Sequence, residues 1–93
     1  MLPEVKQDAT ARINRVVGQV AGIKKMIDED RYCVDILTQV AAVRTALESL
    51  GFEVLEDHVN HCVRDALTAG DAKVATTKSE ELLAAVQRFA KTR

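Results

Sequence analysis

The chain has 93 residues, the length of a single domain spanning residues 1–93, and 47% of them are hydrophobic, which predicts a folded protein. It contains no Trp, one Tyr and two Phe, so its core has few large side chains and we expect the protomer to associate with further copies. The net charge of −1 excludes a uniformly basic nucleic-acid binder.

No apolar run is long enough to span a bilayer, and no signal-peptide pattern precedes the first predicted helix. We therefore expect a cytoplasmic protein with no membrane partner. In a reducing compartment its two cysteines, Cys33 and Cys62, are more typical of ligands or redox groups than of a structural disulfide.

A first helix is predicted from Pro3 or Glu4 to about Asp28, because apolar residues recur at three- and four-residue spacing and Pro suits a first helical turn. Its basic residues outnumber its acidic ones as far as position 25. The basic residues are Lys6, Arg12, Arg15, Lys24 and Lys25, and the acidic ones are Glu4 and Asp8. Positive charge is thus concentrated on the first helix of an acidic molecule.

A second, long helix is predicted from about Tyr32 to about Ala69, with Asp30 as its N-cap and Gly70 and Asp71 at its end. Gly51 costs about 1 kcal/mol relative to Ala inside a helix, but the periodicity continues in register beyond it. The buried side of this helix is expected to carry apolar residues, namely Leu37, Val40, Leu47, Val54 and Val59.

A third, shorter helix is predicted after the capping-box pattern Thr77-Lys78-Ser79-Glu80. With little room for strands, the fold class is all-α, with a protomer of three helices and a long central one.

Three side chains on the long helix form a candidate metal site. His58 and Cys62 are four positions apart and so project from one face of a helix, whereas Cys33 lies in its first turn. A helix rises roughly 37 Å between positions 33 and 58, while a metal needs ligands within about 2.3 Å. An antiparallel partner helix would bring Cys33 to the other two, with the two-fold axis near Leu47.

Two thiolates and an imidazole form a soft ligand set that suits Cu(I) or Zn(II). A closed zinc site usually has a fourth ligand, and none is evident, so Cu(I) is the first choice and Zn(II) the second. A rival donor, His61, projects about 60° away round the helix. Read without a metal, Cys33 and Cys62 are simply free cysteines and His58 a partly exposed polar group.

Four segments resemble the CsoR/RcnR-type metal-responsive repressors. The run RINRVVGQVAGI from Arg12 to Ile23 is similar to the first-helix signature of that family, and YCVDILTQ from Tyr32 to Gln39 is similar to the start of its second helix. The His58-x-x-x-Cys62 pair and the run Ser79-Glu80-Glu81-Leu82 follow at the expected places. The resemblance covers nearly the whole chain.

The resemblance implies an antiparallel homodimer that assembles into a homotetramer, a dimer of dimers, and binds operator DNA when metal-free. Metal binding then weakens DNA affinity and relieves repression. Cys at 33, His at 58 and Cys at 62 are the pattern of the copper sensors. Tyr32 and Glu81 match positions that link the metal site to the DNA face.

For DNA binding, the resemblance implies Arg12 and Arg15, with Gln19 beside them. Some copper sensors have a further Arg where this chain has Ser49, so that contact is absent here or moved to Arg44. Without the resemblance, the two arginines would read as the solvated face of an amphipathic helix.

Other functions on the same scaffold remain open. A persulfide- or oxidant-sensing repressor would work through a Cys33–Cys62 link between protomers, although such relatives lack a histidine at position 58. A helical copper buffer would bind metal without DNA. No nucleophile or base has an evident orienting partner, so we expect neither an enzyme nor a small-molecule substrate.

Overall fold

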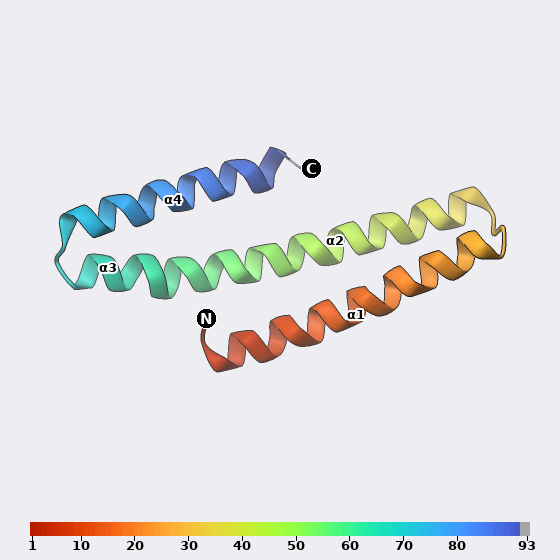
Figure 1. Ribbon diagram of the computed structural model, residues 1–93, viewed down its shortest axis with the longest axis horizontal. Coiled ribbons are helices and arrows are strands. Elements are labelled where there is room, and N and C mark those ends of the chain that lie inside the picture. The colour runs from red at the N-terminus through yellow and green to blue at the C-terminus, as the bar shows by residue number, and fades with distance from the viewer. Residues whose placement is uncertain (92–93) are drawn as a thin grey trace.

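The computed structural model describes residues 1–91, except for the side chains at positions 62, 63, 66, 90 and 91. The described chain is helical almost throughout, as the sequence predicts, and no strand occurs in residues 1–91. In chain order the elements are α1 (Pro3–Asp28), α2 (Cys33–His58), η1 (Val59–Val63), α3 (Arg64–Thr68) and α4 (Ala72–Lys91). Elements α2, η1 and α3 follow one another without a break and form the long central helix (Figure 1).

Helix α1 has the predicted bounds, with Pro3 in its first turn. At its other end, Arg31 N donates to Met26 O at 2.9 Å and Asp30 N donates to Ile27 O at 3.1 Å. This pair of bonds is the Schellman motif, in which the residue after the C-cap takes a left-handed conformation. Asp30 has φ 53° and occupies that position. The prediction that Asp30 caps the second helix was therefore wrong, because its backbone ends the first one; the N-cap of α2 is Tyr32.

The central helix contains a π-helical turn, η1, directly after His58. A π turn has i→i+5 hydrogen bonds in place of i→i+4 and so inserts a residue into the regular α pattern. Gly51 lies within α2 and does not interrupt it. The helix ends as predicted near Ala69, where Gly70 takes the left-handed conformation with φ 75°.

Helix α4 begins earlier than the sequence pattern indicated. The side chain of Asp71 accepts hydrogen bonds from Lys73 N and Val74 N, both at 3.1 Å, and thereby caps the helix. Thr77 lies inside α4, where its hydroxyl donates to Lys73 O. The predicted capping box at residues 77–80 is therefore wrong, and Glu81 lies in the middle of the helix and not in its first turn.

The three long helical segments lie side by side in one layer. Helix α1 runs antiparallel to α2 along one edge of the central helix, and α4 runs back along the other edge (Figure 1). The Cα atoms span 58 × 28 × 14 Å, so the layer is about one helix thick. Among the described side chains, the buried apolar ones are Val16 and Ala75, which are 5% and 7% exposed.

The layer leaves the apolar side of α2 uncovered in a single protomer. Leu37, predicted to be buried, is 65% exposed, and other residues of that side are also exposed. These are Val40, Leu47, Val54 and Val59. Their burial cannot come from the protomer itself.

Candidate sensor site and nucleic-acid interface

The first of the three predicted metal ligands, Cys33, is the first residue of α2. Its thiol is free and exposed. The preceding residue, Tyr32, accepts hydrogen bonds through its carbonyl from Asp35 N and Ile36 N, which secures the first turn of the helix. Cys33 is thus presented at a well-defined helix start and is open to a ligand or another chain.

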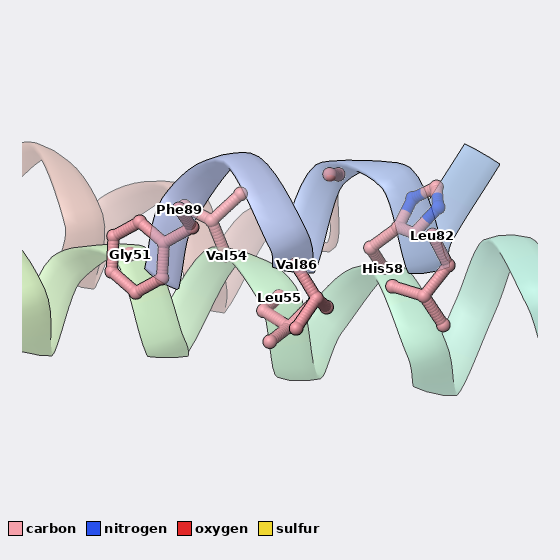
Figure 2. Close-up of a pocket in the computed structure, with 8 residues that line it drawn as sticks. Gly51, Val54, Leu55, His58, Leu82, Val86 and Phe89 are labelled. Atoms are coloured by element: carbon pink, nitrogen blue, oxygen red, sulfur yellow. The ribbon is translucent and has the colours of Figure 1, made fainter. Parts of the chain in front are cut away.

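The second predicted ligand, His58, is the last residue of α2 and is half-buried. It lines an apolar pocket of about 280 Å³ between α2 and α4 (Figure 2). The side chains of Leu82 and Val86 reach this pocket from α4. The half-buried imidazole therefore lies beside apolar side chains of the last helix.

The third predicted ligand, Cys62, lies on the π-helical turn, and its side chain is outside the described residues. The four-residue spacing of His58 and Cys62 predicts that they lie one regular α-helical turn apart. The backbone between them is instead π-helical, so their angular relation differs from that of an α-helical pair. Single π turns are frequent at functional sites.

Within one protomer, the structure holds Cys33 and His58 apart, because they are the two end residues of the unbroken helix α2. At about 1.5 Å per residue they are separated by roughly 37 Å. Among the described side chains, no group of three His, Cys, Asp or Glu residues lies close enough to hold a metal ion. A site that uses both residues needs a second chain.

The rival donor His61 faces Asp57, with Nε2 3.8 Å from Oδ1. Asp57 is a buried carboxylate, 6% exposed. Its Oδ1 also accepts a long hydrogen bond from Leu2 N at 3.5 Å, and its Oδ2 lies 3.8 Å from the amine of Met1. His61 is therefore directed toward the start of α1 and its acidic neighbour.

The predicted DNA-binding residues of α1 gather on one recess. Arg12, Arg15 and Gln19 line a hollow of about 150 Å³ together with Ala46 and Ser49 of α2. The α1 side chains thus lie beside Ser49 of α2. This arrangement brings two guanidinium groups to one surface of the α1–α2 pair.

The other predicted residues lie apart from this recess and from His58. Arg44 is exposed on α2, with Nε 3.6 Å from Glu48 Oε1. Glu81 is exposed on α4, with Oε2 3.6 Å from Lys78 Nζ. Tyr32 is exposed and is the N-cap of α2, so it lies at the opposite end of that helix from His58. One protomer therefore does not bring Tyr32 and Glu81 together.

Sequence reasoning missed two acidic residues in contact with Arg12. Arg12 Nε lies 3.2 Å from Glu53 Oε2 and 3.4 Å from Asp8 Oδ2. The four-residue spacing of Asp8 and Arg12 on a helix is a signal that could have indicated the first contact. No sequence signal indicates the second, because α2 supplies Glu53 only through tertiary packing.

The sequence of this chain matches a known protein family. The profile of the family described as metal-sensitive transcriptional repressor matches residues 5–88. The chain is 45% identical over 86 residues to the copper-sensing transcriptional repressor CsoR of Bacillus subtilis, covering 92% of this chain and 82% of that protein.

Solved structures of metal-responsive regulators have the same fold as this chain. The Cu(I)-bound copper-sensing repressor CsoR of Geobacillus thermodenitrificans superposes with a TM-score of 0.88 at 37% identity, covering 97% of this chain and 91% of the other. The nickel-responsive regulator InrS superposes with a TM-score of 0.76, also at 37% identity, over 89% of this chain and 90% of the other. The scaffold is thus shared by sensors of different metals.

The chain belongs to the family of metal-sensitive transcriptional repressors. It is a metal-responsive repressor and, like the members of that family, a transcription regulator and not an enzyme. No helix within residues 1–91 has the length and apolar character needed to cross a membrane.

Proposed function

We propose that this protein is a Cu(I)-responsive repressor that binds operator DNA without metal and releases it when Cu(I) binds. The site would combine Cys33 of one protomer with His58 and Cys62 of its antiparallel partner, and two dimers would form a tetramer. The observation that carries the proposal is the unbroken helix α2, with an exposed thiol at its first residue and an imidazole at its last.

The donor chemistry supports copper over nickel or zinc. Two thiolates and one imidazole suit Cu(I), which accepts three ligands, whereas a structural zinc site is usually closed by a fourth. The exposed apolar residues of α2 from Leu37 to Leu47 support association of two such helices. The similarity of the chain to copper-sensing repressors also supports copper as the metal.

The geometry also suggests how the residues divide the work. Cys33, His58 and Cys62 would hold the ion, a soft cation that would bridge the two chains of the dimer. Arg15 and Arg12 would contact phosphates from α1, which is a separate element. Copper would therefore act by changing how α1 and α2 are arranged and not by competing for the DNA-binding residues.

The test is an anaerobic Cu(I) titration followed by fluorescence anisotropy of a labelled duplex from the promoter of the protein's own gene. We expect DNA release at about one Cu(I) per protomer, and X-ray absorption should show about two sulfurs and one nitrogen around copper. DNA release by persulfide without copper would favour the thiol sensor. Copper binding by a protein with no affinity for the duplex would favour the buffer.

Single substitutions can distinguish the loss of a metal ligand from a loss of the folded, DNA-binding protein. Cys33→Ala, His58→Ala and Cys62→Ala should each still bind the duplex but no longer release it with Cu(I). His61→Ala is the matched control for His58→Ala and should respond as the wild type does. A His61→Ala protein that lost the response, with His58→Ala unaffected, would overturn the proposed ligand set.

A further inference from the structure

Arg12 lies between two carboxylates from different helices. Its Nε is 3.4 Å from Asp8 Oδ2, one turn earlier on α1, and 3.2 Å from Glu53 Oε2 on α2. The guanidinium is half-buried, with 38% of the side chain exposed. When all three groups are ionised, this cluster carries two negative charges and one positive charge, so its net charge is −1. A DNA phosphate that approaches Arg12 therefore competes with two carboxylates for the guanidinium.

Glu53 is the less well satisfied of the two carboxylates. Its Oε1 is buried and, among the described residues, has no hydrogen-bond donor. The pKa of Glu53 is raised because its protonated form hydrogen-bonds to Asp8 and because burial disfavours its charge, while Arg12 opposes the shift. The pKa of Asp8 is lowered, first by the same hydrogen bond and then by Arg12, with Arg15 adding to the effect. When the pair of carboxylates binds a proton, that proton therefore resides on Glu53.

We propose that Glu53 and Asp8 form an acidic clamp that withholds Arg12 from DNA, and that operator binding is accompanied by uptake of one solvent proton by this clamp. The proposal rests on the proposed role of Arg12 in DNA binding. Protonation of Glu53 brings the net charge of the cluster from −1 to zero and removes the carboxylate that competes with phosphate for the guanidinium. The charged groups that face this position are Asp8, Arg12 and Arg15 from α1 and Glu53 from α2.

The sign of the pH dependence follows from the raised pKa of Glu53. DNA affinity should increase as the pH falls toward that pKa, because protonated Glu53 no longer competes for Arg12. Glu53→Gln reproduces the uncharged form, so it should bind DNA more tightly near neutral pH and show a shallower pH dependence. His58 and His61 are present in both proteins, so they do not account for a difference between them.

The test measures anisotropy of a labelled promoter duplex, without metal, for the wild type and for Glu53→Gln. We expect binding roughly two- to fivefold tighter in the variant, which is the order of magnitude of a surface ion pair converted to affinity. Glu56→Gln is the matched control, because it removes the same charge from an exposed position one turn along α2. Asp8→Asn, on the exposed part of α1, should act in the same direction and keeps the test valid if Glu53→Gln folds poorly.

Arg12→Ala separates failure of the clamp from failure of the proposed DNA face. In that background Glu53→Gln should change affinity no more than Glu56→Gln does. If Arg12→Ala weakens binding but Glu53→Gln fails to strengthen it, the clamp is overturned and Glu53 is a support for Arg12. If Arg12→Ala leaves binding unchanged, the DNA face is misplaced and the clamp is overturned with it. A carboxyl ¹³C NMR titration in which Glu53 titrates as an ordinary glutamate overturns the clamp without reference to DNA.

Discussion

Gly51 faces the ring of Phe89 across the interface between α2 and α4 (Figure 2). A Cβ atom built on Gly51 would lie 2.5 Å from the tip of that ring, closer than two carbon atoms can approach. The same ring meets Phe52 edge to face, with centroids 5.4 Å apart. Glycine at this position therefore lets α4 approach α2 closely at Phe89, although it weakens the helix locally.

Gly51→Ala tests this close approach. Alanine is favoured over glycine in a helix by about 1 kcal/mol, but overpacking typically costs about 1–3 kcal/mol. We expect a net loss of up to about 2 kcal/mol in the free energy of unfolding, measured in urea at fixed protein concentration. In a Phe89→Leu background the same substitution should be neutral or stabilising. An equal loss in both backgrounds would mean that the ring is not the cause.

The salt dependence of DNA binding tests Arg15. Its charge should help to neutralise the DNA backbone, so Arg15→Ala should lower affinity and flatten the plot of log affinity against log salt by about 0.9 for each phosphate that is no longer neutralised. Cu(I) affinity should change little, since the proposed ligands lie on another element. Arg88→Ala, an exposed arginine of α4, removes the same charge elsewhere and should leave the slope unchanged. Equal slopes for wild type and Arg15→Ala would remove Arg15 from the interface.

At the scale of elements, the helix ends depend on backbone conformation as much as on residue type. Asp30 and Asp71 both lie between helices, yet Asp30 takes a left-handed conformation at the end of α1 whereas Asp71 accepts two backbone hydrogen bonds at the start of α4. Aspartate serves both purposes, because its short polar side chain tolerates the left-handed region and also caps helices. The local pattern at Thr77 resembled a cap but lies within α4.

Substitution at the cap should distinguish these positions. Asp71→Ala removes the acceptor for Lys73 N and Val74 N and should lower the free energy of unfolding by about 1 kcal/mol. Asp71→Asn keeps an acceptor and should cost less. Thr77→Ala is the control at the sequence-predicted cap and should be nearly neutral in urea denaturation. A larger loss from Thr77→Ala than from Asp71→Ala would restore the capping box at residues 77–80.

At the scale of the molecule, a single layer of helices cannot enclose a core. Both faces of the layer meet solvent, so apolar side chains that follow a helical period remain exposed on the protomer. Exposed apolar surface of this extent on a small chain favours association. The proposed metal site depends on the same association, because α2 holds Cys33 and His58 at opposite ends.

Leu47→Glu tests the link between assembly and metal binding. Leu47 lies near the middle of α2 on its apolar side, where an antiparallel partner would place the two copies close together. Two like charges there should shift the protein toward monomer in sedimentation velocity and weaken Cu(I) binding in a competition titration. Thr45→Glu, an exposed position on another side of α2, should do neither. A monomer that retained full Cu(I) affinity would contradict the shared site.

The helical period and the signals for helix starts and stops were enough to predict an all-α protomer, the bounds of α1 and the long central helix. The three candidate ligands also followed from spacing, because a rigid helix of known rise determines how far apart Cys33 and His58 must lie. The similarity to metal-sensing repressors was carried by short continuous segments of the sequence, such as residues 12–23 and 32–39. These features depend on residues that are near neighbours along the chain.

Features that depend on how helices pack could not be predicted in this way. The contact between Arg12 and Glu53, the approach of Phe89 to Gly51 and the π turn at η1 each involve the relative placement of backbones. The choice of Asp71 over Thr77 as the cap depends on where the chain reverses after Gly70. Sequence spacing specifies which face of a helix a side chain occupies, but the element it meets on that face is determined only when the helices pack against one another.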